Sequence, residues 1–360
     1  MNRSHIDALS AHHSLPANAV QALLIWNGQT PNRLDWARFW FALTRSAGII
    51  AIGVGSIFFI AANWQQFPVF GRFALLEILL LLACAIAWWR PAPSVIGQSA
   101  LMLAMLLIAA LLALFGQTYQ TGADVYELFF AISGLSLFAP LCARHIAHWL
   151  LWLVIFNIAL ILYCVSEISL FGFLMTLNTN LGAVWIFAGL MNALVVLTSR
   201  LPGLRAYFQC ANSQWLDRLA LFFLVAYFTW AMLSATVFSH ARFSTDNGRI
   251  NDYSIDYVVT TLSYMLMVAV IVWRCFSAKR DIFPLALVAM SGIVVSTSIL
   301  LRHSFNENAG GFFMLTLWVI ATSTAASFML MHYFNKWQSG GELKLDSILR
   351  DPIPSRADHE

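Results

Sequence analysis

The chain has 360 residues, of which 60% are hydrophobic and only 10% are charged. Soluble globular domains carry roughly 25% charged residues, so this composition excludes an ordinary soluble protein. It predicts an all-α, polytopic integral membrane protein with a helical bundle. Basic residues exceed acidic ones slightly, by 20 to 17, and the formal net charge is +3 at pH 7.

The first 42 residues are predicted to form a cytoplasmic helical region. Residues 17–27 have one apolar side, as in a short helix, and Gly28 follows as a natural stop. Residues 34–41 mix aromatic side chains with arginines, which is typical of a helix in the lipid headgroup region. The start of the chain does not have the pattern of a cleavable signal peptide.

A membrane span needs about twenty apolar residues, because a rise of ~1.5 Å per residue must cross ~30 Å of hydrocarbon. Ten stretches satisfy this requirement within a predicted transmembrane bundle at 43–333. They are approximately 44–62, 72–89, 96–115, 125–143, 147–165, 181–198, 218–238, 257–275, 282–301 and 311–333. The apolar stretch 168–177 is too short and is predicted to be interfacial or re-entrant, and 334–360 is predicted to be a flexible cytoplasmic tail.

Two patterns indicate how the spans pack. Small residues let membrane helices approach closely, and the first span has Ala47, Ala51 and Gly55 at four-residue spacing. This span is therefore predicted to pack tightly inside the bundle. Asn157 and Asn192 lie within the fifth and sixth spans, where an amide is expected to form hydrogen bonds between helices.

The distribution of Lys and Arg predicts the orientation in the membrane. Sixteen of the 20 basic residues lie on the side of the N-terminus, and four lie on the other side. Basic residues close to spans stay in the cytoplasm, so both termini are predicted to be cytoplasmic. The connection between the third and fourth spans then faces outward.

That connection is a polar, glycine-rich segment between two long apolar stretches. Residues 115–130 read FGQTYQTGADVYELFF and follow an almost entirely apolar stretch. One interpretation is a solvated turn, in which Gly116 and Gly122 adopt positive φ and Asp124 caps the next helix. The other is a set of groups that converge on a ligand or a partner, since a plain turn needs only four or five residues.

Glu77 is the other unusual polar residue, because it lies within the second span in the run FALLEILLLLACAIAWW. A charged carboxylate in a span costs about 2.5–3.5 kcal/mol on insertion scales, so Glu77 is expected to face the protein interior. It lies at the depth of the outer loop, whose amides and hydroxyl could donate to it. The candidate binding residues are Asn63, Trp64, Glu77, Gln117, Tyr119, Gln120, Asp124 and Glu127.

Motifs that would indicate an enzyme are missing from the sequence. It contains no G-x-S-x-G, no H-E-x-x-H and no Walker glycine loop, which disfavours a hydrolase or a nucleotide-driven pump. His145 and His148 are three residues apart, but two histidines without a third ligand are weak evidence for a metal. No catalytic residue, metal site or cofactor is predicted.

Three segments carry a resemblance to a known family. They are AANW at 61–64, GQTYQTGADVYELFF at 116–130 and LLWLVIFNIALILY at 150–163. Together they make roughly the first 165 residues similar to the bacterial membrane proteins of domain of unknown function 2157. This resemblance implies a bacterial inner-membrane location, and it implies no catalytic residue because the family has no established activity.

Three functions are compatible with these features. The first is transport or binding of a small solute or lipid component through an outward-facing polar site. The second is a non-catalytic partner or scaffold whose outer loop, 116–127, docks another envelope protein. The third is a membrane-embedded enzyme. Each predicts contact with the lipid bilayer and none involves nucleic acid.

Overall fold

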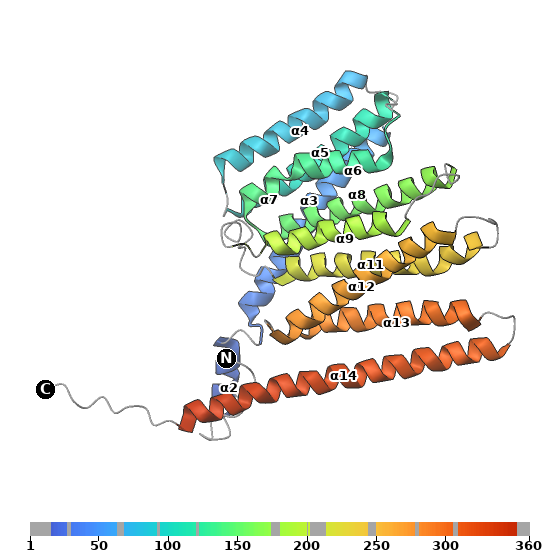
Figure 1. Cartoon of the computed structure of the whole chain (residues 1–360). Helices are drawn as coiled ribbons and strands as arrows, with labels where there is room; N and C mark the ends of the chain where they lie inside the picture. The colour runs from blue at the N-terminus through green and yellow to red at the C-terminus, as the bar shows by residue number, and fades with distance from the viewer. Residues whose placement is uncertain are drawn as a thin grey trace. The chain divides into compact units, whose positions relative to one another are not determined.

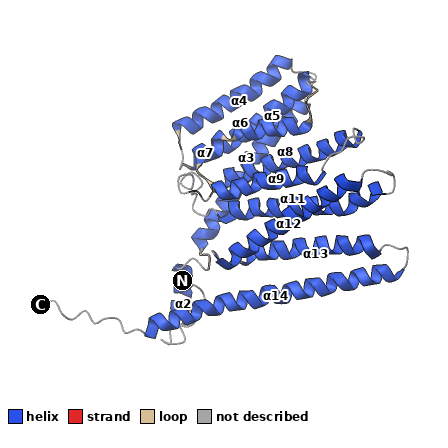
Figure 2. Ribbon diagram, in the orientation of Figure 1, coloured by secondary structure: helices blue, strands red, loops and turns tan. Residues whose placement is uncertain are grey.

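The computed structural model describes residues 16–26, 30–62, 68–91, 94–119, 122–173, 181–199, 201, 214–243, 250–277, 281–304 and 309–350. All regular structure within these residues is helical, which confirms the predicted fold class (Figures 1 and 2). The helices are α2 (Ala17–Trp26), α3 (Arg33–Ala62), α4 (Val69–Trp89), α5 (Val95–Tyr119), α6 (Val125–Ser136), α7 (Phe138–Ala143), α8 (Ile146–Phe173), α9 (Leu181–Thr198), α11 (Gln214–Phe243), α12 (Ile250–Ser277), α13 (Ile282–Ser304) and α14 (Ala309–Arg350).

Each predicted span corresponds to helical structure. Within the described ranges, nine helical stretches are long and apolar enough to cross a bilayer, with α6 and α7 together forming one of them. The tenth predicted span is α9, whose apolar part, Gly182–Thr198, is shorter than these nine. The stretch 168–177 differs from the prediction, because residues 168–173 continue α8 and residues 174–177 lie outside the described residues.

The chain forms two compact units, one comprising Met1–Ala47 and Ser327–Glu360, the other Gly48–Ala326. In the first unit, α3 begins with a reciprocal cap. The Asn32 side-chain oxygen accepts the Asp35 N–H at 2.8 Å, and the Asp35 carboxylate accepts the Asn32 N–H at 3.0 Å. This cap starts a helix that joins the predicted headgroup segment and the first span without a break.

The C-terminal helix is longer than the composition suggested. Helix α14 runs through Arg350, so residues 334–350 are helical where a flexible tail was predicted. Residues 351–360 lie outside the described residues.

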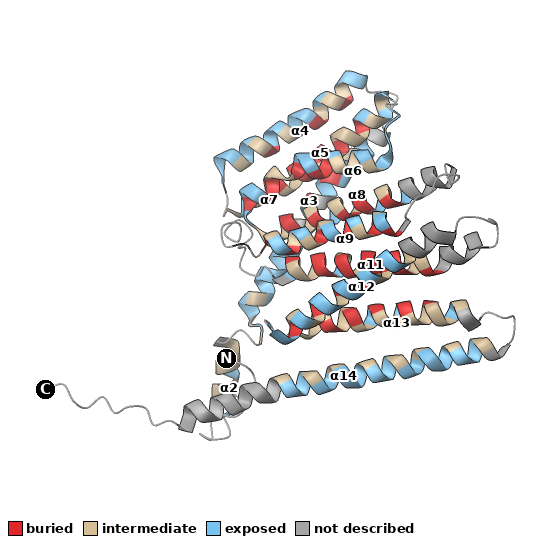
Figure 3. Cartoon of the chain, viewed as in Figure 1, coloured by how far each residue is buried: buried red, intermediate tan, exposed pale blue. Residues whose placement is uncertain are grey.

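In the second unit, helices α4 to α13 lie side by side, and their connections alternate between two ends of the bundle (Figure 1). The pairs α4 with α5, α6 with α8, and α9 with α11 pack together, and α11 also contacts α8, α12 and α13. Buried residues follow α5, α8, α9 and α11, whereas α4 is mostly exposed (Figure 3). Trp88 and Trp89 at the end of α4 are 89% and 81% exposed, as expected for an aromatic belt at the membrane boundary.

The first span does not pack as its small residues predicted. Most of its described residues are exposed, and a Cβ added at Gly55 would meet nothing within 4 Å. The predicted stripe fails because Ala51 and Gly55 are exposed, while the neighbouring Gly53 is the glycine that meets Leu106. Small-residue spacing alone therefore chose the wrong side of this helix.

The close approach between helices occurs instead at α9 and α11. A Cβ at Gly189 would lie 2.6 Å from the Phe228 ring, and Gly189 is buried. A Cβ at Gly182 would similarly clash with the Thr260 hydroxyl of α12. Glycine is thus required where α9 packs against its neighbours.

The predicted interhelical role of the two asparagines is confirmed. Asn157 Nδ2 donates to Asn192 Oδ1 at 3.1 Å, and Asn192 Nδ2 donates back to Asn157 Oδ1 at 2.9 Å. Each amide also donates to a carbonyl of its own helix, at Leu153 and Ala188, and the Tyr227 hydroxyl donates to the Asn157 carbonyl at 3.2 Å. This fully buried cluster links α8, α9 and α11.

The fourth span is broken near its middle. Helix α6 ends at Ser136 and α7 begins at Phe138, on either side of a turn at Leu137. Pro140 accounts for the break, because it has no N–H and its ring clashes with the carbonyl four residues earlier. The fully buried Pro140 is held in place by the surrounding helices.

One carbonyl at the break is paired with a side chain of another helix. The Leu137 N–H donates to Gly134 at 3.4 Å rather than to the carbonyl of Ser133. That carbonyl instead accepts the Trp152 indole N–H at 2.8 Å. Trp152 is itself stacked on Phe156, with ring centroids 5.3 Å apart. A side chain of α8 therefore pairs a carbonyl that the break releases, as a lipid environment favours.

Gly189→Leu should destabilise the fold far more than Gly55→Leu. The first change forces a branched side chain into the α9–α11 contact, with an expected cost of about 1–3 kcal/mol or more. The second places it in open space, where surface changes stay within about 0.5 kcal/mol. The measurement is thermal unfolding of each purified variant in one detergent. Equal loss of stability for both variants would contradict the packing described above.

The Asn157 and Asn192 amides should be energetically coupled. Each single change to Ala leaves the other amide without its partner in an apolar core, whereas the double change removes both. Double-mutant cycles in membrane proteins give about 0.6 kcal/mol on average and about 1.7 kcal/mol at most, and this doubly bonded pair should lie in the upper half of that range. Equilibrium unfolding of the four proteins in mixed micelles measures the coupling, and purely additive effects would contradict the pair.

Candidate functional site

The polar segment after the third span is mostly helix. Helix α5 continues through Tyr119 and α6 begins at Val125, so only residues 120–124 connect them. Gly116 lies within α5, which contradicts the expected turn there, whereas Gly122 has φ of +67° as expected. The long loop predicted over 115–130 is therefore a short connection between two helix ends that carry the polar residues.

Asp124 occupies the N-cap position of α6 but does not cap it with its side chain. Its backbone carbonyl accepts the Glu127 N–H at 3.0 Å, and its carboxylate makes no capping hydrogen bond. The carboxylates of Asp124 and Glu127 are both exposed. Neither forms a hydrogen bond or ion pair with another side chain in the described part of the chain.

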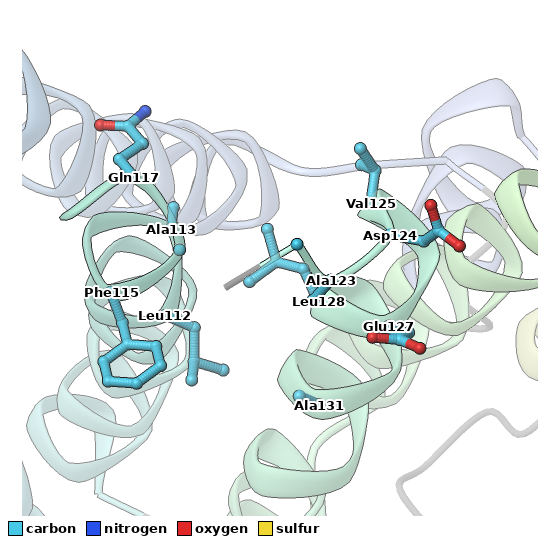
Figure 4. Close-up of a pocket in the computed structure, with 12 residues that line it drawn as sticks. Leu112, Ala113, Phe115, Gln117, Ala123, Asp124, Val125, Glu127, Leu128 and Ala131 are labelled. Carbon is cyan, nitrogen blue, oxygen red and sulfur yellow. The ribbon is translucent and has the colours of Figure 1, made fainter. Parts of the chain in front are cut away.

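A pocket of about 570 Å³ lies between the end of α5 and the start of α6 (Figure 4). It is lined by Leu112, Ala113, Phe115, Gly116, Gln117, Gly122, Ala123, Asp124, Val125, Glu127, Leu128 and Ala131. Leu112 and Leu128 point into the space between the helices, while the Gln117 amide points away from it (Figure 4). The pocket thus has apolar walls and polar groups at its rim.

Aromatic side chains join each of the two helices that form the pocket to a further helix. They join α5 to α4, and α6 to α8. On α5, Tyr119 lies 4.8 Å from Phe115 and 6.1 Å from Phe73 of α4, between ring centroids. Tyr119 is therefore part of the α4–α5 contact and does not line the pocket. On α6, Tyr126 lies 5.3 Å from Tyr163 of α8 on the same measure.

Glu77 does not face the protein interior, although the free-energy cost of a charged carboxylate in lipid predicted that position. Its side chain is exposed, because α4 packs on α5 through the side that carries Leu76 and Ala83. The structure records no hydrogen bond from Glu77 to Gln117 or Tyr119, and the pocket does not include it. Asn63, Trp64 and Gln120, the other predicted members of the site, lie outside the described residues.

The apolar wall residues were not among the predicted site residues. Leu112 and Ala113 on α5, and Leu128 and Ala131 on α6, complete the pocket. A signal for the α6 wall was present in the sequence, because Asp124, Leu128 and Ala131 share one helix face at spacings of four and three. Chemistry alone points to the polar residues, whereas this periodicity points to the apolar wall.

The histidine pair makes a structural contact. His148 is buried and its Nε2 donates to the Gln98 carbonyl at 2.9 Å, which joins the start of α8 to the start of α5. Among the described residues, no group of three or more His, Cys, Asp and Glu side chains could hold a metal ion.

These features define a polytopic, helical integral membrane protein. Residues 14–149 match the model of a family described as "Predicted membrane protein (DUF2157)", which confirms the resemblance over little more than a third of the chain. The matched range includes both 61–64 and 116–130 but ends before 150–163, where the resemblance was also expected. No curated protein and no solved structure matches the chain.

Proposed function

We propose that the protein binds a small solute or lipid component in the α5–α6 pocket, on the outward-facing side of a bacterial inner membrane. The pocket itself is the observation that carries this proposal. It combines apolar walls with Gln117, Asp124 and Glu127, three of the predicted site residues, at one rim. A concave, mostly apolar space with a few polar groups is the usual form of a ligand site.

A lipid component fits this pocket better than a water-soluble solute. The walls are formed by residues of membrane-spanning helices, and the lining residues Phe115 and Val125 and the nearby Leu135 are exposed large apolar side chains. These residues extend the apolar surface of the pocket toward the bilayer. An amphiphile could therefore enter from the side while its polar end stays near the rim.

Binding is favoured over transport by the packing of the bundle. Between α8, α9 and α11 the interior is occupied by the Asn157–Asn192 pair and by Leu160, Ala188 and Tyr227. Passage of a molecule at this position would have to separate hydrogen-bonded helices. The pocket, by contrast, is open at the helix ends and needs no such movement.

A docking role for the outer loop is the second candidate. Residues 122–125 are all exposed, and the same filled packing is what a non-catalytic partner or scaffold would have. The two proposals predict different effects of a variant in which a large side chain fills the pocket. It would abolish ligand binding, but it would leave intact the surface on which another envelope protein docks.

The arrangement of basic residues supports the outward orientation of the pocket. Arg90, Arg144 and Arg218 adjoin connections at the end of the bundle opposite the α5–α6 connection (Figure 1). Arg218 is also paired there with Asp281, at 3.5 Å. Because basic residues near spans stay in the cytoplasm, the end with the pocket faces outward.

Filling the pocket should abolish ligand binding. Ala113→Trp places a large ring between α5 and α6, and a loss of ~1.4 kcal/mol of contact already lowers the affinity for the ligand roughly tenfold. The measurement is native mass spectrometry of the full-length protein with its co-purified molecules. Ala131→Trp tests the opposite wall, and Ala74→Trp on the exposed side of α4 is the control. Adducts that survive both pocket changes, or a wild-type protein without adducts, would contradict the proposal.

The orientation can be tested by thiol labelling. In a variant without native cysteines, Ala123→Cys should react with a membrane-impermeant maleimide in intact spheroplasts, because it lies at the outward end. Pro91→Cys is exposed at the other end and should react only after lysis. The reverse pattern would place the pocket on the cytoplasmic side.

A further inference from the structure

We infer that the α5–α6 pocket selects one membrane lipid whose headgroup carries a primary ammonium, as ethanolamine phospholipids do. This inference rests on the proposed function, since it names the class of ligand that the same pocket binds. Three observations support it: the negative charge at the rim, the apolar walls, and the distance from the rim to the deepest apolar residues of the pocket.

The rim carries an excess of negative charge. Asp124 and Glu127 lie one turn apart at the start of α6, and neither carboxylate is paired with another side chain within the described residues. The residues that line the pocket in the described structure include no Lys, Arg or His. Two neighbouring carboxylates repel a purely anionic headgroup, whereas an ammonium can donate three hydrogen bonds to them.

The apolar walls distinguish a lipid from a free ammonium compound. Both carboxylates are exposed, and ion pairs between exposed groups contribute little on their own. Burial of an apolar chain against Leu112, Leu128 and Ala131 would supply the remaining free energy of binding. The ammonium then determines which lipid is preferred, and the chain provides affinity.

The dimensions of the pocket are compatible with a headgroup at the rim and an acyl chain along the walls. Along α6, the seven residue steps from Asp124 to Ala131 rise ~10 Å, and along α5 the five steps from Leu112 to Gln117 rise ~7.5 Å. The distance from the polar rim to the deepest apolar residues thus matches the length of part of a lipid, namely its headgroup, its glycerol and the first carbons of a chain. The rest of the chains would remain in the bilayer.

Titration of the full-length protein with two lipids of identical acyl chains tests the inference. Phosphatidylethanolamine and phosphatidylglycerol are compared by native mass spectrometry. We expect the wild-type protein to prefer the ethanolamine lipid roughly fivefold, the size that two exposed ion pairs would give. The double change Asp124→Asn and Glu127→Gln should abolish the preference, and Glu127→Lys should reverse it.

Two controls separate the headgroup inference from the proposed function. Glu77→Gln removes an exposed carboxylate of α4 at the same end of the bundle, outside the pocket, and should leave the preference unchanged. Ala113→Trp should remove binding of both lipids. Equal binding of both lipids that is still lost in Ala113→Trp would overturn the headgroup inference alone. Absence of any binding that depends on the pocket would overturn the proposed function as well.

Discussion

One constraint governs the rest of the structure. Polar groups within the spans must form their hydrogen bonds inside the protein. Lipid offers no partner for an amide or a carbonyl, so Asn157 and Asn192 bond to each other and to their own helices. The resulting link holds α8, α9 and α11 together. The Ser133 carbonyl, released by the break in the fourth span, is satisfied in the same way by Trp152. The candidate site lies away from these paired groups, at the helix ends.

Most of the fold could be predicted from the sequence, because a helix that crosses lipid requires a long apolar stretch that is easy to recognise. Twenty apolar residues without a charge have few alternatives to a helix, and each predicted span is helical. Contacts between helices were less predictable. A buried amide must find a partner, so Asn157 and Asn192 were identified correctly, but a small residue is useful only where another helix approaches. Gly55 and Gly189 look alike in sequence, and only the neighbouring Phe228 distinguishes them.

The candidate site was predictable only in part. Gln117, Asp124 and Glu127 were chosen for their polarity, and all three line the pocket. The cost of a charge in lipid suggested an interior position for Glu77, but it lies only about two turns from the start of α4, where a side chain can extend toward the interface. The walls could not be chosen by chemistry, because Ala113 is like any other alanine of a span. Their role depends on which helices diverge, and composition does not contain that information.

Aromatic residues join the end of α5 and the start of α6 to different neighbouring helices. Tyr119 and Phe115 join the end of α5 to Phe73 of α4, and Tyr126 joins the start of α6 to Tyr163 of α8. Large rings therefore stabilise contacts that draw the two helix ends toward different neighbours. The sides that remain facing each other carry several small residues, including Ala113, Gly116, Ala123 and Ala131. Because these side chains are too short to fill the space, the same packing that stabilises each helix end leaves an open pocket between them.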